Sequence, residues 1–470
     1  MKEASKKNER TKKRTVDFDH SESRRSFLKK SAGLAAAGLI GSSTIWAGAN
    51  ERIRVGICGI RGQGRTHIGV REVDGVFRIV EWGGYSSIEN TQVATICDVD
   101  ERELAKRVAE MEKAGVPAPR LETDVRRLLE DDSIDVISIA TPNHWHSLIG
   151  IWACQAGKDV YIEKPLSHNT TEGKKLIEAA QKYKCIVQHG SQSRSVAAMR
   201  EGVQHLRAGL IGEVYMAKGM CYKWRDTIGH TPDEPVPEGV HYDLWIGPAP
   251  ERPFSRNRFH YNWHWQWPYG NGDIGNQGMH QLDVARWGLG VVYPKRIQTM
   301  GGHYMFTDDQ TTPNTMISTF EYPDENKMLV FEVRHWITNH EGGLGEGASD
   351  NIGNIFYGSK GYAIFSTAGY ETYLGRNREP GPSNVGGGAT HFQNFIDCVR
   401  SRKSDALHAE VEEGHRSCTL LHLANAAYRA GRTIEFDPEK EAAIGDAEAQ
   451  SYVDGSWRGY RKPYELPSHI

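Results

Sequence analysis

Two polar stretches of the sequence carry residue types that acid–base chemistry needs. The first is Glu163-Lys164-Pro165, which follows a short apolar run over residues 159–162. Pro165 lacks an amide hydrogen and biases Lys164 toward an extended conformation, so a strand is expected to end here. Ligands of open parallel α/β sheets collect at the carboxyl ends of the strands. Lys164 is therefore placed to meet whatever the sheet binds; the tripeptide alone is also compatible with a solvated lysine in a turn.

The second stretch lies between Gly272 and Trp287 and spaces its polar residues by three or four. On a helix, residues at this spacing share one face. Gly275 and Gly278 each cost about 1 kcal/mol in a helix interior, which indicates a close approach by a ligand or another element. A lone histidine is more often structural, but a polar stripe with glycines favours a functional site. The stripe comprises Asp273, Asn276 or Gln277, His280 and Asp283.

A glycine-rich turn precedes both stretches. Residues 53–58 read as a strand that runs into Gly59-Ile-Arg-Gly62-Gln-Gly64, and a helical pattern starts near residue 65. Glycines after a strand permit a tight turn and let backbone N–H groups approach a pyrophosphate at the helix N-terminus. The match to G-x-G-x-x-G is imperfect because Arg61 holds the middle glycine position, with Gly62 one residue further on. Gly59, Gly62 and Gly64 are the expected cofactor-binding glycines, and an ordinary turn is the alternative.

An acidic pair follows the second predicted strand, residues 93–97. A carboxylate in this place accepts hydrogen bonds from the ribose hydroxyls of NAD and repels the 2′-phosphate of NADP. We expect Asp98 to have this role. Asp98 is also a candidate helix N-cap, but Asp100 fits that role better. The distance from the glycine turn exceeds the usual ~20 residues, so we expect an insertion around residues 75–90.

The third predicted strand covers residues 136–140 and ends in Thr141-Pro-Asn-His-Trp-His146. A helical pattern over residues 148–153 leads to the strand that carries Lys164. Strands and helices thus alternate, and the chemistry is confined to the strand ends. This order predicts an α/β fold with a doubly wound parallel sheet.

Four motifs in this order resemble the Gfo/Idh/MocA oxidoreductase family, whose namesakes include glucose–fructose oxidoreductase and inositol dehydrogenase. They are the glycine turn, Cys97-Asp98-Val99-Asp100, Thr141-Pro142-Asn143-His144 and Glu163-Lys164-Pro165, and the resemblance extends over residues 52–435. It implies a Rossmann domain followed by a C-terminal α/β domain. The open, mostly antiparallel sheet of the second domain would carry the substrate and mediate oligomers, so a homo-dimer or homo-tetramer is expected.

The resemblance also implies residue roles. Lys164 would lie between nicotinamide and substrate, and Thr141 and Asn143 would line the nicotinamide side. His146 and Glu163 are also expected in the cofactor site; Glu163 belongs to the Glu163-Lys164-Pro165 motif, and His146 lies two residues after His144.

The polar stripe matches the family's D-x-G-x-H-x-x-D helix with one departure. Asn276 stands where the family has a catalytic aspartate, four residues before His280. The side-chain amide of asparagine does not take up or release a proton at ordinary pH. His280 therefore remains the expected base, but the group that would relay its proton is left open. Asp283 matches the second acid of the motif, and Asp273 is expected only to cap the helix. Lys164, His280, Asn276 and Asp283 are the expected catalytic set.

The remaining elements are read from apolar periodicity. An aromatic loop region at residues 225–270 would serve either core packing or stacking on sugar faces. Glycine-rich loops are expected at 341–349 and 379–389 and a polar tail from residue 438. The expected helices cover 169–184, 195–208, 392–400 and 412–430, and the expected strands 185–188, 214–222, 295–304, 314–322 and 327–336.

Composition excludes some functions. The formal charge is −3, and because residues 1–49 carry +6, the rest carries −9. An acidic body argues against nucleic acid as a partner. The seven cysteines are scattered and form no C-x-x-C pair, so neither a disulfide framework nor a metal site is expected.

The N-terminus has the pattern of an export signal. Ser23-Arg24-Arg25-Ser26-Phe27-Leu28-Lys29 precedes a weakly apolar run over residues 32–45 and then Ala47-Gly48-Ala49. This is a basic region, a short apolar region and an A-x-A cleavage site, too short to span a bilayer comfortably. It resembles a twin-arginine signal, which implies export to the periplasm by the twin-arginine translocase. A disordered basic tail is the alternative.

These observations predict four segments: a signal peptide (1–49), an NAD-binding Rossmann domain (52–190), a substrate and oligomerisation domain (191–435) and a tail (436–470). The leading function is an NAD-dependent oxidoreductase acting on a hydroxyl of a sugar, sugar acid or polyol, with tightly bound cofactor. The first alternative is an NAD-using glycoside hydrolase or lyase with a 3-keto intermediate, which net NADH production would distinguish. The second is a non-catalytic sugar-binding protein.

Overall fold

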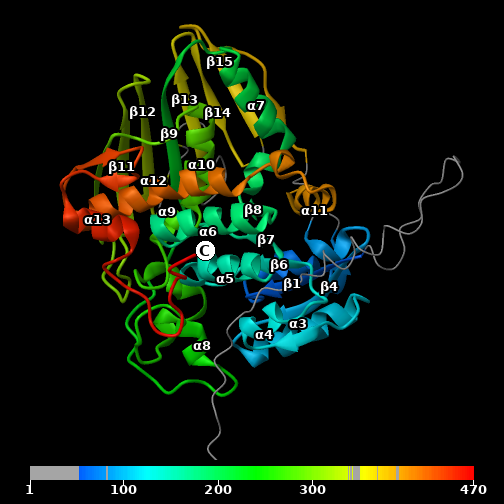
Figure 1. Cartoon of the computed structure of the whole chain (residues 1–470). Coiled ribbons are helices and arrows are strands. Elements are labelled where there is room, and N and C mark those ends of the chain that lie inside the picture. The colour runs from blue at the N-terminus through cyan, green and yellow to red at the C-terminus, as the bar shows by residue number, and fades with distance from the viewer. Residues whose placement is uncertain are drawn as a thin grey trace, which may run out of the picture. The chain divides into compact units, whose positions relative to one another are not determined.

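The first half of the chain folds around a six-stranded parallel sheet in the computed structural model (Figure 1). The strand order is β5-β4-β1-β6-β7-β8. This is the doubly wound sheet predicted from the alternation of strands and helices. The strands are β1 (Ile53–Cys58), β4 (Thr91–Cys97), β5 (Arg120–Glu122), β6 (Val136–Ile139), β7 (Asp159–Ile162) and β8 (Val187–His189).

The structure describes residues 52–470 except 81–82, 337, 339–340, 342–343, 345–349, 368 and 388–390. The predicted signal peptide and most of the predicted loop at 341–349 lie outside this part of the chain. No helix in the described part is both long and apolar enough to cross a membrane.

Helices cover both faces of the parallel sheet. Two of these helices begin where a short polar side chain caps the first turn. Asp100 accepts a hydrogen bond from the amide of Arg102 and starts α3, as expected. Asn169 accepts from the amide of Glu172 and starts α6. The extra residues between β1 and β4 include a hairpin of β2 (Val70–Val73) and β3 (Val76–Ile79), which begins before the expected insertion at 75–90 and overlaps it only in part. The helices are α2 (Gln63–Ile68), α3 (Glu101–Lys113), α4 (Val125–Leu129), α5 (Asn143–Gln155) and α6 (Thr170–Tyr183).

The second sheet has eleven strands in the order β16-β15-β14-β13-β9-β12-β11-β10-β18-β19, with β17 beside β15. All of its pairs are antiparallel except β9 with β12, which are parallel. The predicted open, mostly antiparallel sheet is therefore confirmed. Its strands are β9 (Val214–Tyr222), β10 (Arg296–Gly302), β11 (Thr315–Tyr322), β12 (Lys327–Arg334), β13 (Asn351–Gly358), β14 (Gly361–Phe365), β15 (Gly369–Leu374), β16 (Glu379–Pro380), β17 (Asn384–Val385), β18 (Ile434–Asp437) and β19 (Ala442–Ala443).

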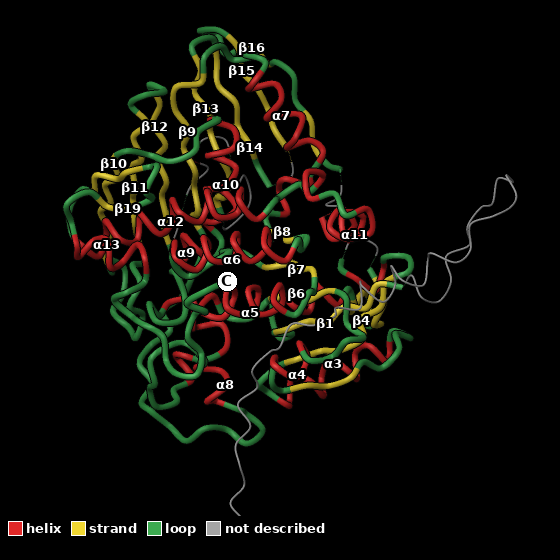
Figure 2. The backbone as a smooth tube through the Cα atoms, in the orientation of Figure 1, coloured by secondary structure: helices red, strands yellow, loops and turns green. Residues whose placement is uncertain are grey.

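One face of this sheet packs against three helices, α7 (Ala197–Arg207), α10 (Gly278–Leu289) and α12 (Val411–Ala430). Side chains of β11 alternate between buried and exposed, as a sheet with one covered face requires. Between β9 and the polar stripe the backbone runs mostly as loop with short helical turns, as Figure 2 shows. This is the aromatic region.

Two expectations about local structure were wrong. The polar stripe is not one helix: α9 (Gly272–Gly275) and α10 are separated at Asn276, whose ψ of −94° is not helical. The predicted loop at 379–389 contains β16 and β17, because antiparallel pairing with β15 arises only in the folded sheet. The tail contains α13 (Ala447–Asp454), which packs on α12 and α6.

Candidate functional site

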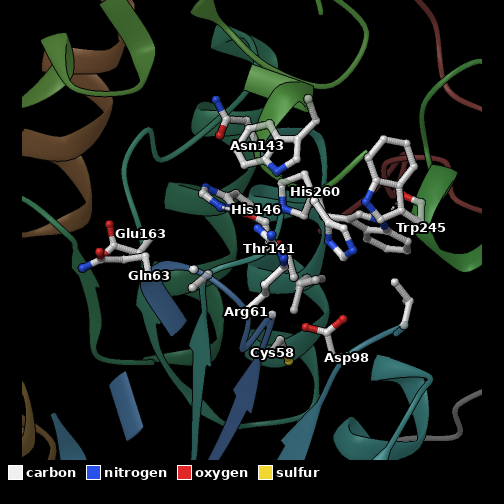
Figure 3. Close-up of a pocket in the computed structure, with 18 of the residues that line it drawn as sticks. Cys58, Arg61, Gln63, Asp98, Thr141, Asn143, His146, Glu163, Trp245 and His260 are labelled. Atoms are coloured by element: carbon white, nitrogen blue, oxygen red, sulfur yellow. Dashed lines mark hydrogen bonds between the residues drawn. The ribbon is translucent and has the colours of Figure 1, made fainter. Parts of the chain in front are cut away.

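A cavity of about 270 Å³ opens at the carboxyl ends of β1, β4, β6 and β7 (Figure 3). One side is formed by these strand ends, and the other by residues 244–264 of the aromatic region. Asp98 and Trp245 lie toward one end of the cavity in Figure 3, and Glu163 lies at the opposite end. The structure thus brings all of the predicted cofactor residues except Gly64 to the lining of one cavity.

The glycine turn shapes one end of this cavity. Gly59 has a φ of +76°, and a Cβ there would approach the Ala140 carbonyl oxygen to 2.6 Å. A Cβ on Gly64 would lie 1.7 Å from the Gly59 oxygen, so a side chain is excluded at both positions. Gly62 differs, because a Cβ there would meet no atom within 4 Å and would only fill open space. Gly62 therefore keeps room for a ligand, and the turn itself requires Gly59 and Gly64.

Asp98 lies at the end of β4 and faces the cavity (Figure 3). One carboxylate oxygen accepts from the Ile60 amide at 2.9 Å and the other from the Asp100 amide at 3.1 Å. Burial raises the pKa of Asp98 to about 6, although the two amides oppose this shift. Asp98 thus has the position expected for a ribose-binding carboxylate, and Asp100 caps the helix.

The Thr141–His146 segment follows β6 and begins α5. The Thr141 hydroxyl is buried without a hydrogen-bond partner among the described residues, and Thr141 lines the cavity. Asn143 donates to Asn271 Oδ1 at 3.0 Å. The ring nitrogens of His146 lie 2.7 Å from the carbonyl oxygens of Pro165 and Thr141. His146 therefore lines the cavity, but both of its ring nitrogens contact backbone carbonyl oxygens. Burial lowers the pKa of His146.

Glu163 and Lys164 follow β7 and lie at the far end of the cavity. The Glu163 carboxylate accepts from Gln192 at 2.8 Å and lies 3.3 Å from His67 Nε2. Burial favours the neutral acid, but the hydrogen bond from His67 and the nearby charges lower the pKa of Glu163 to about 2. Burial also lowers the pKa of Lys164, opposed by the charge of Glu163. Glu163 is thus a buried anion that balances the charge of Lys164.

Lys164 reaches the second domain through Asn276. Its Nζ donates a hydrogen bond of 2.8 Å to the backbone carbonyl of Asn276. The break between α9 and α10 frees that carbonyl, because the ψ of Asn276 is not helical. The Asn276 side chain points elsewhere and donates to Asp273 at 3.2 Å. Asn276 therefore positions the lysine through its main chain, whatever its side chain.

Asp273 is the charged centre of this region, and the expectation that it only caps a helix was wrong. Arg225 donates to both of its carboxylate oxygens at 3.0 and 3.2 Å, and His335 Nε2 lies 3.1 Å from Oδ2. Burial opposes ionisation, but the charge of Arg225 holds the pKa of Asp273 well below its usual range. Arg225 and His335 follow the carboxyl ends of β9 and β12, the parallel pair of the second sheet. A parallel pair thus brings both to Asp273 by the same geometry that places Lys164.

His280 lies on α10, half-buried, with no hydrogen bond to its ring within the described part of the chain. Burial and the charge of Lys164 lower the pKa of His280 to about 4, so the imidazole is neutral at pH 7. Asp283 does not hydrogen-bond to it. Asp283 accepts from Arg194 at 2.8 and 2.9 Å and from Ser417 at 2.6 Å, and these partners hold its pKa at about 2 despite burial. The structure therefore places Asp283 in a buried ion pair.

The sequence interpretation missed His264, which lines the cavity with Lys164 and Asn276, whereas His280 does not. Its Nδ1 donates to the Tyr261 carbonyl at 2.5 Å, and its ring stacks on Trp263 with centroids 3.6 Å apart. Burial lowers the pKa of His264 to about 3, so this imidazole is also neutral at pH 7. Its only signal in the sequence is its place between Trp263 and Trp265 in the aromatic region.

The aromatic region divides between the two roles considered for it. Trp245 and Tyr269 belong to a buried cluster with Phe254 and Phe259. Tyr261 is 45% exposed and lines the cavity together with Trp263. Within the described part of the chain, no group of three metal-ligating side chains is assembled.

Comparison with known families gives two matches. Residues 53–191 match the Gfo/Idh/MocA profile described as an oxidoreductase family with an NAD-binding Rossmann fold. Residues 196–314 and 383–465 match the C-terminal α/β domain of the same oxidoreductase family.

Curated relatives match over a shorter stretch. A glycosyl hydrolase family 109 protein from Shewanella pealeana is 25% identical over 221 residues, 41% of this chain and 44% of that protein. An alpha-N-acetylgalactosaminidase from Shewanella oneidensis is 27% identical over 196 residues, 40% of this chain and 37% of that protein. The chain thus spans less than half of the length of these relatives.

Solved structures share the fold at low identity. The WlbA dehydrogenase from Bordetella pertussis, in complex with NADH and UDP-GlcNAcA, has a TM-score of 0.58 and 19% identity over 82% of this chain and 99% of that one. The aldose-aldose oxidoreductase from Caulobacter crescentus, complexed with glycerol, has a TM-score of 0.57 and 17% identity over 82% of this chain and all of the other.

Proposed function

The chain belongs to the Gfo/Idh/MocA oxidoreductase family and carries its NAD-binding Rossmann domain, and on this basis we propose that it oxidises a hydroxyl of a sugar, sugar acid or polyol. The observation that carries the proposal is the position of Lys164. It lies in the cofactor cavity and is hydrogen-bonded to Asn276 of the second domain. A substrate held against the second domain at this point would meet the cation of Lys164 and the neutral imidazole of His264.

The residues of the cavity fit NAD. Asp98 is placed for ribose hydroxyls, the Thr141 hydroxyl is buried with no partner in the described residues, and a Cβ on Gly62 would fill open space. When bound, NAD supplies a nicotinamide ring that takes up or returns a hydride. The proposed preference for NAD over NADP rests on the partly buried carboxylate of Asp98, which would face a 2′-phosphate.

The chain's own groups would handle the proton. Lys164 would donate a hydrogen bond to the reacting hydroxyl and stabilise the negative charge that develops on its oxygen. His280 is neutral at pH 7 and has no partner for its ring in the described chain, so it is free to take the hydroxyl proton. His264 is a second neutral imidazole beside Lys164 and is the other candidate base.

The test is turnover by purified protein with a panel of sugars, sugar acids and polyols, followed by the reduced-nicotinamide absorbance and by product mass. Oxidation of at least one panel member supports the proposal. Sugar binding without oxidation or hydrolysis would instead support a non-catalytic sugar-binding protein.

A second candidate function is glycoside cleavage with NAD as a recycled cofactor. It is favoured by the names of the curated relatives, a glycosyl hydrolase family 109 protein and an alpha-N-acetylgalactosaminidase. Release of the leaving group from an aryl glycoside, without net NADH, would select it. Stoichiometric NADH would select simple oxidation.

Two further proposals follow from the sequence. The twin-arginine pattern supports export of the folded protein to the periplasm, where free NAD would be scarce. Retention at sub-micromolar NAD needs a binding free energy beyond roughly −8 kcal/mol, so we expect bound NAD to survive dialysis and the reaction to be redox-neutral. Fractionation of cells with intact and Arg24→Lys/Arg25→Lys chains tests export.

Light scattering of the purified chain tests for the proposed homo-dimer or homo-tetramer.

A further inference from the structure

The cavity wall opposite Asp98 comes from the second domain. It consists of Leu244, Trp245, Phe259 and His260, which we call the outer wall. Trp245 lies at the same end of the cavity as Asp98, and His260 lies between that end and the middle (Figure 3). The strand-end carboxylate of a Rossmann domain marks the adenosine half of a bound dinucleotide. The outer wall therefore faces the adenosine half.

A short backbone pairing ties this wall to the Rossmann domain. The Glu101 amide donates to the Gly239 carbonyl at 2.9 Å, and the His241 amide donates to the Val99 carbonyl at 2.8 Å. Between them Asp100 and Val240 form an antiparallel bridge. We call residues 99–101 and 239–241 the clasp. The clasp begins directly after Asp98, and its first residue, Val99, lines the cavity beside that carboxylate.

Side chains support the same contact. His260 Nε2 lies 3.2 Å from the buried carboxylate of Asp100, and His241 Nε2 lies 2.8 Å from Glu101 on the surface. The backbone of His260 has a left-handed φ of +43°, which is rare for a residue other than glycine. A rare conformation at a cavity-lining residue indicates that the surrounding contacts determine its place.

A second attachment fixes the other end of the wall. Trp145 Nε1 donates to the Leu244 carbonyl at 3.1 Å, and His144 Nε2 lies 3.0 Å from the Trp245 carbonyl. Both belong to α5 of the Rossmann domain, whereas Leu244 and Trp245 belong to the chain that follows β9. The wall is thus held at two places by the domain whose ligand it covers.

We propose that the outer wall encloses the adenosine half of NAD and that the clasp must open before the dinucleotide can leave. The inference rests on NAD as the cofactor of the proposed function and adds the residues that retain it. An apolar surface suits the flat faces of a purine, and the wall lines the cavity with Trp245 and Phe259, which the buried aromatic cluster holds in place. Release then requires at least the two clasp hydrogen bonds to break, so the clasp limits the release rate.

The test uses the full chain loaded with adenine-labelled NAD and measures label release into excess unlabelled NAD. His241→Pro removes the amide that donates to Val99, and the φ of −85° at His241 is close to what proline adopts. His241→Ala is the matched control, because it removes the imidazole but keeps the amide. We expect release at least ~10-fold faster in His241→Pro than in His241→Ala, with circular dichroism unchanged. Equal rates in the two variants would overturn the proposal.

A disulfide across the clasp gives an independent test that survives a folding defect in the proline variant. A Cβ on Gly239 would lie 3.6 Å from the Glu101 Cβ, within the ~3.5–4.5 Å that disulfides require. The Glu101→Cys/Gly239→Cys chain can be compared with itself, oxidised and reduced, which controls for strain at the positive φ of Gly239. Oxidation should slow release at least ~10-fold, and reduction should restore it.

The outcomes separate the two proposals. A wild-type chain that carries no NAD after purification and also binds no added NAD by calorimetry contradicts the proposed function. A chain that binds NAD tightly but releases it at one rate, whether the clasp is intact, broken or locked, contradicts the clasp alone.

Discussion

The ammonium of Lys164 is hydrogen-bonded to the main-chain carbonyl of Asn276, 112 residues away, over 2.8 Å. This contact joins the end of β7 in the Rossmann domain to the break between α9 and α10 in the second domain. It assigns to Asn276 a role that does not depend on a side-chain proton. The carboxylate of this region is Asp273, to which the Asn276 side chain donates.

Asn276→Asp should keep measurable turnover, because the carbonyl that Lys164 uses belongs to the main chain. The new carboxylate would replace an amide that lies 3.2 Å from Asp273. Two such carboxylates cannot both ionise without cost, so we expect roughly 2 kcal/mol of lost stability at pH 7. Denaturant unfolding measures this. Asn276→Ala removes the hydrogen bond without adding charge and should lose less; an equal or larger loss in Asn276→Ala would contradict the charge explanation.

Lys164→Ala and His280→Ala should each lose at least ~10²-fold in turnover while still binding NAD, as expected of an electrostatic and a general-base group. Steady-state rates and calorimetry with NAD separate chemistry from binding. His264→Ala is the informative comparison, since His264 lines the cavity and His280 does not. A larger loss in His264→Ala than in His280→Ala would move the base to His264.

The pH profile of kcat/KM should be broad. Burial and the charge of Lys164 lower the pKa of His280 to about 4, so the base is neutral above this pH and the rate falls as pH drops through it. Burial lowers the pKa of Lys164, so the alkaline limb should begin below the ordinary lysine range. A limb near pH 6.5 that disappears in His280→Gln would show instead that His280 titrates as an ordinary histidine.

Asp98 should make cofactor choice depend on pH. Burial raises its pKa to about 6 in the free protein, so Asp98 is mostly ionised at pH 8 and mostly neutral at pH 5. Repulsion of a 2′-phosphate requires the ionised form, and the affinity ratio of NADH to NADPH should therefore be larger at pH 8. Fluorescence titration of the two dinucleotides at both pH values measures it. In Asp98→Asn the ratio should be smaller and nearly independent of pH, and tighter NADPH than NADH binding by the wild type would refute the assignment.

Asp283→Asn should reduce stability more than catalysis. Breaking a buried ion pair costs on the order of 3 kcal/mol, and Arg194 and Asp283 have side chains only 6% and 1% exposed. The partners of Asp283 depress its pKa to about 2, so the wild-type advantage is complete above the ordinary range near 4 and shrinks as pH falls toward 2. Urea unfolding at pH 7 and pH 3 measures both. A variant of wild-type stability with a large loss of kcat would return Asp283 to the catalytic set.

The sequence by itself determined the parallel sheet, the positions of the residues that end its strands and the division of labour between Asp98 and Asp100. These features depend on neighbours within a few residues: an apolar run bounded by glycine or proline, and an acid before a helical pattern. Alternation of strands and helices then leaves few topologies. The family resemblance added the second sheet, whose strands from residue 351 to 385 were not predicted.

Tertiary structure decided the interior of the site. The Asn276 carbonyl could not be identified in advance, because the break that exposes it depends on contacts with Asp273 and Lys164. Asp273, Arg225 and His335 are separated in sequence and meet only because β9 and β12 run parallel. The clasp pairs residues about 140 positions apart, such as His241 with Glu101. Such contacts leave no local periodicity in the sequence, since their register is set by how the aromatic loop packs on the Rossmann domain.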